Sequence, residues 1–369
     1  MKIDVFKVPM TGPDDLEGLR LLIKEKKVRP ENIIAIIAKT EGNGNVNDFT
    51  RGFTASTFQL FLSEHLRCSK DEVNNRVSIV CSGGCEGVMS PHATIFAKSD
   101  NGSQKKRTEK RLAIGVKNTR KLLPEEIGTS IQAKVVAQAV REAMADATIH
   151  DPADVHFVQI KCPLLTSERM NNAEDRGKKV VTKDTLKSMG FSRGASALGV
   201  AIALKEVEEK RVTDSAICNN GSLFSNVAST SAGVELMNNE IVVMGNSLES
   251  SSDYVIGHAV MKDLIDTEAI WDALKNAGIM RKGMEMIGEQ DVAKIVNIFA
   301  KAGAHPSGLV RGRRTTMLTD SDISSTRHAR SVVNALIAGI VGDPMVYVSG
   351  GTEHQGPLGG GPVAVIAHL

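Results

Sequence analysis

Three segments of the chain repeat one order of chemically active residues. Each segment has a lysine at the end of an apolar run, an arginine at the start of an amphipathic stretch and a serine in a turn of small residues. The lysines are Lys39, Lys161 and Lys301, the arginines are Arg51, Arg193 and Arg327, and the serines are Ser82, Ser229 and Ser349. One such triplet carries little weight, but three in the same order are hard to obtain by chance.

These residue types favour chemistry on a small, oxygen-rich molecule. Arginine is a fixed cation whose planar donors match carbonyl or enolate oxygens. Serines followed by glycine, as in Ser82-Gly83 and Ser349-Gly350, bring hydroxyl and backbone N–H groups close to a ligand. A lysine that is partly desolvated beside arginines has a lowered pKa, so its neutral amine is able to remove a proton from serine. The pattern therefore indicates a Ser-Lys amide hydrolase that needs no metal.

The elements that position these residues can be inferred from the local patterns. The runs 33–39, 155–161 and 295–301 predict strands, and the arginine of each segment opens a stretch with helical spacing of apolar residues. A second strand then delivers the serine, and a further apolar strand follows. We predict an α/β chain of three homologous units. Their predicted ranges are 1–104, 112–249 and 254–369.

An arrangement of these units around a pseudo-threefold axis would bring the equivalent side chains together. The three lysines, arginines and serines would then surround one pocket. Such a pocket suits a small, planar, acidic ligand that itself has threefold symmetry.

Composition narrows the class of protein. The chain has 369 residues, of which 41% are hydrophobic and 24% charged, which is typical of a soluble globular protein. Its 45 Lys and Arg residues nearly balance 43 Asp and Glu residues, so no excess charge favours a nucleic-acid or membrane partner. We expect the basic segment 105–111 to be a solvated linker.

The compartment follows from similar observations. Five scattered cysteines argue against a disulfide framework. The first residues lack a leader-like apolar segment, and the apolar runs fall far short of the ~18 residues of a membrane span. We therefore expect a cytoplasmic protein.

Common catalytic motifs are absent from the sequence. We find no GxSxG elbow, no HExxH zinc motif and no GxxxxGK[ST] phosphate loop. The nine histidines form no cluster with ligand-like spacing.

Longer motifs surround the repeated residues. They are Ala38-Lys39-Thr40-Glu41-Gly42-Asn43-Gly44, Asn47-Asp48-Phe49-Thr50-Arg51-Gly52-Phe53, Gln159-Ile160-Lys161-Cys162-Pro163, Ser192-Arg193-Gly194-Ala195-Ser196-Ala197, Ser229-Thr230-Ser231-Ala232-Gly233-Val234-Glu235 and Ser349-Gly350-Gly351-Thr352-Glu353-His354-Gln355-Gly356-Pro357. Through these motifs the sequence resembles the ring-opening amidohydrolases, the family of cyanuric acid hydrolase and barbiturase. The resemblance spans essentially the whole chain.

The resemblance implies a fold, an activity and an assembly. In the fold, three α/β units place their strands around a central pocket and their helices outside. The implied activity is hydrolytic ring opening of cyanuric acid to carboxybiuret, which loses carbon dioxide to give biuret. The implied assembly is a homo-oligomer, a tetramer, with a small cyclic imide as substrate and with no nucleic-acid or membrane partner.

Carried over by position, the resemblance assigns roles to individual residues. It makes Ser229 the nucleophile and Lys161 its base, both in the middle unit. The local sequence also sets this unit apart, since its turn reads Ser-Thr-Ser and Lys161 is followed by Cys-Pro. The implied substrate-binding residues are Lys39, Arg51, Ser82, Gly83, Arg193, Thr230, Lys301, Arg327, Arg330, Ser349 and Gly350. Arg330 is included because it lies about one turn beyond Arg327 on the same helix face.

A cation site is the one implied feature from which this sequence departs. Related sequences commonly read Lys-Ala-Glu where this chain has Lys301-Ala302-Gly303. The site would be completed by a loop that contains Thr352, Gln355, Gly356, Pro357 and Gly360. Without the glutamate, these loop groups would hold a hard cation with weaker charge compensation. We expect no cofactor in catalysis, and a structural role for any Mg or Ca ion.

Two other functions remain open at this stage. Barbituric acid differs from cyanuric acid by a CH₂ in place of a ring NH, so barbiturase activity is the nearest alternative. A non-catalytic binding protein for a planar anion is the second. The three lysines argue against it, because binding requires positive charge but no paired serine.

Overall fold

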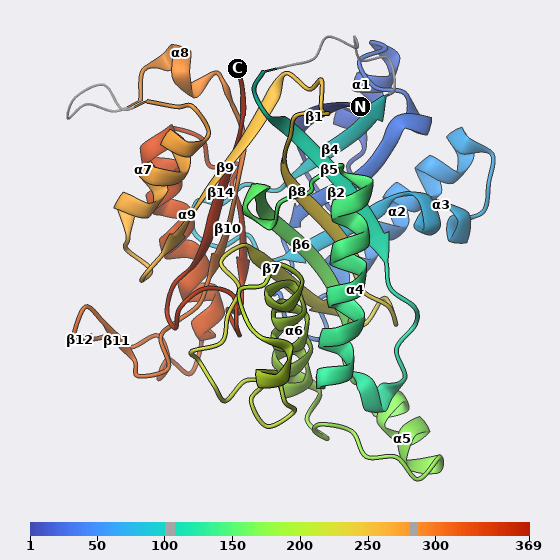
Figure 1. The fold of residues 1–369 in the computed structure, drawn as a ribbon, viewed down its shortest axis with the longest axis vertical. Coiled ribbons are helices and arrows are strands. Elements are labelled where there is room, and N and C mark those ends of the chain that lie inside the picture. The colour runs from blue at the N-terminus through green and yellow to red at the C-terminus, as the bar shows by residue number, and fades with distance from the viewer. Residues whose placement is uncertain (100–107, 281–286) are drawn as a thin grey trace.

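The computed structural model describes residues 1–99, 108–280 and 287–369. Residues 105–107 of the basic segment lie outside this part of the chain. Three four-stranded sheets form the centre, and helices cover their outer faces (Figure 1). In the described part, no helix is long and apolar enough to cross a membrane.

The first sheet sets the pattern for the other two. Its strands follow the order β1-β4-β2-β3, in which β2 pairs parallel with β3 and antiparallel with β4. A right-handed β-α-β crossover is the usual way to connect such parallel neighbours. The elements are β1 (Lys2–Pro9), α1 (Glu17–Lys24), a 3₁₀ turn (Pro30–Asn32), β2 (Ile33–Thr40), α2 (Phe49–Leu66), α3 (Lys70–Arg76), β3 (Ser78–Gly83) and β4 (His92–Ser99).

The middle unit repeats this topology as β5-β8-β6-β7. Two helices of this unit, α4 and α6, pack against each other and against the sheet. The elements are β5 (Arg111–Asn118), a 3₁₀ turn (Pro124–Glu126), α4 (Ser130–Asp146), a 3₁₀ turn (Pro152–Asp154), β6 (Val155–Pro163), α5 (Ser167–Asp175), α6 (Thr185–Ala203), a 3₁₀ turn (Glu209–Arg211), β7 (Ala228–Gly233) and β8 (Glu240–Ser247).

The third unit has the same order again, β9-β14-β10-β13, and adds a small hairpin. The elements are β9 (Tyr254–Met261), α7 (Thr267–Asn276), α8 (Glu289–Val292), β10 (Ile295–Ala302), β11 (Leu309–Val310), β12 (Arg313–Arg314), α9 (Ser325–Val341), β13 (Tyr347–Gly350) and β14 (Gly361–His368). Even the register shift near the start of the second strand recurs, at Ile33/Ala35, Val155/Phe157 and Ile295/Asn297. The predicted α/β fold of three repeated units is confirmed.

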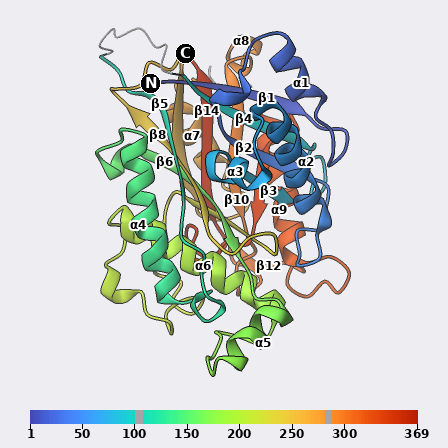
Figure 2. The same ribbon diagram turned by 90° about the vertical axis from the view of Figure 1, so that its right-hand side faces the viewer.

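Each sheet is buried on both faces, which explains the nearly continuous apolar runs in the sequence. On β2, Ile36 packs toward the helices of its own unit, whereas Ile37 joins a central core shared by all three units. On β10, Ala300 and Phe299 divide in the same way. Helices α4 and α6 lie on one side of the central strands, and α2 and α9 lie on the other (Figure 2). Alternate residues of one strand therefore serve two different cores.

Candidate active site

The parallel pairing of β2-β3, β6-β7 and β10-β13 places a lysine beside a serine in every unit. The registered pairs are Lys39 with Ser82, Lys161 with Ser231, and Lys301 with Ser349. The lysines are almost fully buried, with 0%, 2% and 0% of their surface exposed. The three pairs occupy the same position in three copies of one fold.

The register places a different serine beside Lys161 from the one predicted as nucleophile. Ser231 lies beside Lys161, whereas Ser229 lies beside Gln159, two residues deeper in the sheet. The Ser229 hydroxyl is buried and has no hydrogen-bond partner among the described residues. Residues two apart on a strand face the same side, so a Ser-Thr-Ser sequence offers two equivalent candidates. The pairing with β6 separates them.

A sequence signal for Ser231 exists and was missed. A glutamate follows four residues after the registered serine in every unit, as Glu86, Glu235 and Glu353. Counting back four positions from Glu235 selects Ser231 and excludes Ser229. The glutamates contact the repeated lysine or arginine residues, which the Lys-Arg-Ser order did not reveal.

The three registered serines meet at the pseudo-threefold axis. The Oγ atoms of Ser231 and Ser349 are 3.0 Å apart, and Ser82 Oγ donates to Ser349 Oγ at 3.3 Å. Side chains separated by more than a hundred residues in sequence thus form one hydroxyl cluster. This convergence fits a ligand that presents like groups in three directions.

Lys301 and Lys39 contact neutral acceptors at this cluster. Lys301 Nζ lies 3.0 Å from Ser349 Oγ and donates to the carbonyl oxygens of Gly350, at 3.0 Å, and Thr230, at 2.5 Å. Lys39 Nζ lies 3.3 Å from Ser82 Oγ and donates to the Gly83 carbonyl oxygen at 3.2 Å. Gly83, Thr230 and Gly350, all predicted to bind substrate, therefore lie at the site and have carbonyls engaged by lysine.

Burial dominates the titration of these two lysines. It lowers the pKa of Lys39 to about 7, with a further contribution from the positive charge of Arg330. It also lowers the pKa of Lys301 well below the usual value, and Arg193 acts in the same direction. Both amines therefore lose their proton far more readily than a lysine in water.

Lys161 has different partners. Its Nζ forms an ion pair with Glu235 Oε1 at 2.7 Å and donates to the Cys81 carbonyl oxygen at 2.8 Å. Burial alone would raise the pKa of Glu235, but the positive charges of Lys161 and Arg51 outweigh it and lower that pKa. The middle unit therefore holds a charged carboxylate against its lysine.

The arginines use the other two glutamates across unit boundaries. Arg193 binds Glu353 through two hydrogen bonds of 2.8 and 2.6 Å, and Arg330 binds Glu86 through two of 2.7 and 2.5 Å. Such paired contacts fix the guanidinium plane. Each arginine thus ties one unit to the next.

The structure distinguishes the two arginines predicted for the third unit. The Arg330 side chain is 4% exposed, whereas that of Arg327 is 40% exposed and approaches Glu86 only with Nε at 3.3 Å. Arg330 therefore corresponds to Arg193, and Arg327 lies at the margin of the site.

Arg51, in the first unit, is buried but differently compensated. It donates to the carbonyl oxygens of Ala232, at 2.9 Å, and Asn45, at 2.6 Å. Its Nε lies 3.9 Å from an oxygen of Asp48, the residue that caps α2 by accepting from the Thr50 N–H. Arg51 therefore has a carboxylate from its own unit.

One layer below the serines, the three units contribute different residues. The cross-strand pairs are Ile37 with Val80, Gln159 with Ser229, and Phe299 with Tyr347. Three large side chains would collide at an axis, so a close-packed centre requires such unequal sizes. Burial raises the pKa of Tyr347, against a smaller opposite influence of the Ser82, Ser231 and Ser349 hydroxyls. Its phenol therefore lies directly beneath the hydroxyl cluster.

The loop predicted to hold a cation packs closely against Gly303 and Thr230. A Cβ atom at Gly303 would lie 2.1 Å from Thr352 Oγ1, so the position has no room for an acidic side chain. The Gln355 side-chain oxygen already accepts the Thr230 N–H at 2.6 Å. No group of three or more His, Cys, Asp or Glu residues suited to a metal occurs in the described part of the chain.

Two of the carbonyl oxygens predicted to bind the cation accept a hydrogen bond within the loop. The carbonyl oxygen of Thr352 accepts from the Gln355 N–H, and that of Pro357 accepts from the Gly360 N–H. The Gly356 N–H donates to the Ser225 carbonyl oxygen, which connects the loop to the segment before β7. The loop is thus held by protein contacts.

Taken together, the site offers hydroxyls, amines and fixed cations around one centre. It combines potential nucleophiles with potential bases whose pKa is lowered by burial, which is a combination used in covalent hydrolysis of amides. Its charge and polarity suit a planar, carbonyl-rich ligand.

Comparison with known proteins gives a consistent result. Residues 4–368 match the family model described as amidohydrolase ring-opening protein. A cyanuric acid amidohydrolase of Enterobacter cloacae is 57% identical over 100% of this chain and 99% of its own. A cyclic amide hydrolase of Azorhizobium caulinodans is 47% identical, over 99% of both chains. A solved structure of cyanuric acid hydrolase, described as a product of structural concatenation, superposes with a TM-score of 0.95 at 49% identity, over 100% of this chain and 99% of the other.

Proposed function

The chain belongs to the ring-opening amidohydrolase family, and we propose that it hydrolyses the ring of cyanuric acid. It is a hydrolase that acts on cyclic amide bonds, as its relatives' names state. The observation that carries the choice of substrate is the meeting of Ser82, Ser231 and Ser349 from three repeated units. Cyanuric acid has three equivalent carbonyl groups, so each unit would bind one of them in the same way.

In this proposal the middle unit supplies the nucleophile and the base. Ser231 takes the role that sequence reasoning gave to Ser229, because Ser231 is the serine in register with Lys161. Lys161, as a neutral amine, takes the hydroxyl proton while Ser231 Oγ bonds to a ring carbonyl carbon. The ring C–N bond then breaks, and Lys161 passes the proton to the leaving nitrogen.

Water completes the reaction. It attacks the carbamate ester on Ser231, one of its protons returns through Lys161 to the serine oxygen, and carboxybiuret leaves. Carboxybiuret then loses carbon dioxide to give biuret. The choice of the middle unit rests on the family resemblance and on the register that places Ser231 beside Lys161.

The other two units would hold the remaining carbonyl groups. Ser82 and Ser349, with Lys39 and Lys301 beside them, would donate to these oxygens and spread the negative charge of the opening ring. Arg51, Arg193 and Arg330 would supply the surrounding positive charge. Arg327 would act at most at the entrance, because its side chain is 40% exposed.

The proposed mechanism uses no metal ion. The loop from Thr352 to Gly360 would keep a structural role, and a chelator should leave kcat unchanged within about twofold. We also propose a homotetramer, by analogy with the family, which light scattering of the purified chain would test.

A direct assay tests the function. The purified chain is incubated with cyanuric acid and, separately, with barbituric acid, and loss of the ring and release of biuret and carbon dioxide are measured. We expect a kcat/KM at least about 10²-fold higher for cyanuric acid, since a CH₂ offers no partner to a site arranged for a ring NH. Faster opening of barbituric acid would make the chain a barbiturase. Saturable binding of cyanuric acid without turnover would make it a binding protein.

A further inference from the structure

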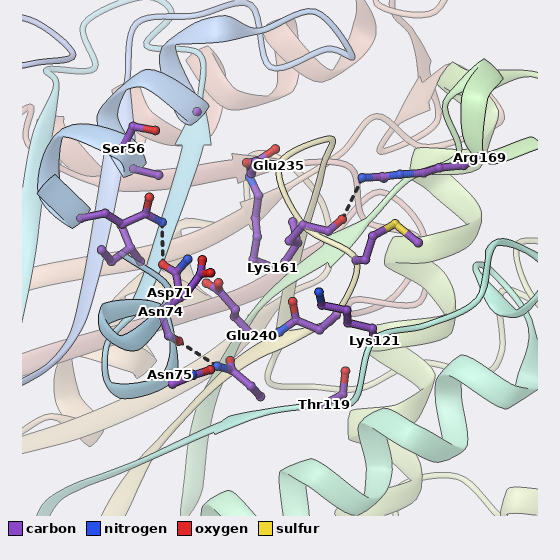
Figure 3. Close-up of a pocket in the computed structure, with 18 residues that line it drawn as sticks. Ser56, Asp71, Asn74, Asn75, Thr119, Lys121, Lys161, Arg169, Glu235 and Glu240 are labelled. Carbon is purple, nitrogen blue, oxygen red and sulfur yellow. Dashed lines mark hydrogen bonds and ion pairs between the residues drawn. The ribbon is translucent and has the colours of Figure 1, made fainter. Parts of the chain in front are cut away.

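Lys161 also lines a cavity whose lining includes none of the three registered serines. This cavity of about 690 Å³ lies between the first and middle units, and we refer to it as the inter-unit cleft. Lys161, Glu235 and Glu240 all line it (Figure 3).

Glu240 occupies a distinctive position in this cleft. It is the first residue of β8 and pairs directly across the strands with Lys161, so both side chains are on the same face of the sheet. Its Oε2 atom is buried and has no hydrogen-bond partner among the described residues. A buried carboxylate oxygen without a hydrogen-bond partner lowers the stability of the fold. Its presence therefore calls for an explanation, and a catalytic role is one.

The equivalent positions in the other units carry no carboxylate. His92 pairs across from Lys39 in the first unit. In the third unit the register continues from Ala300–Val363 to place Pro362 beside Lys301. An acid opposite the lysine is therefore a feature of the middle unit, the unit to which the proposed chemistry belongs.

Several charges act on Glu240. Burial raises its pKa to about 7, Glu235 contributes in the same direction, and Lys161 and the Ile79 backbone N–H oppose the shift. The charged groups that face the cleft from neighbouring elements are Asp71 on α3, Lys121 after β5, Lys161 on β6, Arg169 on α5 and Glu235 after β7. Glu235, whose pKa is lowered, stays an anion, whereas Glu240 gains and loses a proton near neutrality.

We propose that Glu240 is the proton acceptor that discharges Lys161 into the inter-unit cleft. This inference rests on the proposed function. Hydrolysis leaves a carbamic acid, whose proton passes to Lys161, the nearest base. Lys161 is then an ammonium, and Glu235 Oε1, 2.7 Å from its Nζ, is placed to pair with it.

The relay returns Lys161 to its neutral form through the inter-unit cleft, so the proton does not leave past the bound substrate. The Lys161 ammonium gives its proton to the Glu240 carboxylate, which leaves a neutral amine and a carboxylic acid. Glu240 then releases this proton to water in the cleft. One proton leaves for each ring opened, and Glu235 keeps Lys161 in place throughout. Glu240 is thus a positioning and relay residue that acts through Lys161.

Replacing Glu240 by glutamine tests the relay. Glu240→Gln keeps the size of the side chain and an acceptor for the Ile79 N–H but does not titrate. We expect kcat at pH 7 to fall about tenfold, less than the 10²–10⁴-fold typical of a direct acid or base, with KM within about twofold. The parent kcat should rise with pH through about 7, as Glu240 becomes an acceptor, and the variant should lack this rise. Imidazole, which is small enough for the cleft, should restore several-fold of the lost rate.

Glu206→Gln is the matched control. Glu206 also has a pKa raised by burial and a buried oxygen without a partner among the described residues, but it contacts Asn226. We expect this variant to keep the parent pH profile. An unchanged kcat and pH profile in Glu240→Gln would overturn the relay. So would a loss that imidazole does not restore and that Glu206→Gln reproduces together with a lower Tm. Absence of turnover in the parent chain would instead refute the proposed function.

Discussion

The middle and third units share one topology, but their lysines have opposite electrostatic surroundings. Lys301 contacts a hydroxyl and two carbonyl oxygens, and the glutamate of its unit, Glu353, is bound to Arg193. Lys161 instead forms an ion pair with Glu235, the glutamate at the equivalent position. Equivalent lysines of the repeat thus differ because the glutamate of the third unit is bound to an arginine, whereas the glutamate of the middle unit is available to the lysine.

The first unit explains this difference. Arg51 is the arginine expected to bind Glu235, yet it lies near Asp48 and donates to the carbonyl oxygens of Asn45 and Ala232. Ser324 occupies the N-cap position of helix α9, which carries Arg330, without a side-chain cap hydrogen bond, so no cap carboxylate competes there with Glu86. Because Asp48 compensates Arg51, Glu235 remains free to bind Lys161.

Serine-to-alanine variants should show the largest difference in kcat between the three units. We expect Ser231→Ala to lower kcat about 10⁴-fold or more, because the nucleophile is lost. Ser82→Ala and Ser349→Ala should lower it about 10²–10³-fold, as expected for donors to developing charge. Ser229→Ala is the control and should stay within about threefold. Steady-state assays on cyanuric acid measure all four, and a larger loss in Ser82→Ala or Ser349→Ala than in Ser231→Ala would move the nucleophile out of the middle unit.

Alanine variants of the two arginines of the third unit should show the next largest difference, in kcat/KM. Arg330→Ala should lower kcat/KM about 10²-fold, because it removes a buried cation and leaves Glu86 without its bidentate partner. Arg327→Ala should change kcat/KM less than about threefold, because that side chain is 40% exposed. Similar losses in both variants would contradict the assignment of Arg330 to the site.

Asp48→Asn tests whether Asp48 keeps Arg51 from binding Glu235. Asparagine also caps helices well, so α2 should remain intact. With its carboxylate partner gone, Arg51 should turn to Glu235, and Lys161 should lose its ion pair. We expect kcat to fall about tenfold and a crystal structure of the variant to contain an Arg51–Glu235 contact. A Lys161–Glu235 pair that persists in that structure would show that Asp48 does not control it.

The free energies of unfolding of the two lysine variants should differ by ~1–4 kcal/mol. Lys39→Met removes a buried amine without stranding a carboxylate, so it should leave the free energy of unfolding unchanged or raise it by ~1 kcal/mol at pH 7. Lys161→Met strands Glu235 and should lower it by ~1–3 kcal/mol. Urea titrations of both variants give these values. A loss of stability in Lys39→Met as large as in Lys161→Met would remove the distinction.

The same comparison predicts a pH dependence. The pKa of Lys39 is about 7 in the folded chain, against 10.5 for the unfolded chain, so the unfolded state binds more protons between these values. The stability of the parent should therefore rise with pH over this window, and Lys39→Met should lack that contribution.

Much of the fold was available from the sequence. Apolar runs that end in Lys39, Lys161 and Lys301 predicted three repeated α/β units, because strands buried on both faces need nearly continuous apolar sequence. The lysines and arginines were also identified in advance. The serine in register with Lys161 lies two residues after the predicted one, and the glutamates were not part of the predicted Lys-Arg-Ser order, although they recur four residues after the registered serines.

The sequence by itself determined which residue types the site contains and how often they recur, because these follow from composition and periodicity along one chain. Tertiary structure alone decided which copies meet. The β6-β7 register selects Ser231 over Ser229, burial selects Arg330 over Arg327, and the pairing of Arg51 with Asp48 gives Glu235 to Lys161. These choices depend on distances between units, and the energies of hydrogen bonds and ion pairs depend on those distances rather than on separation along the chain.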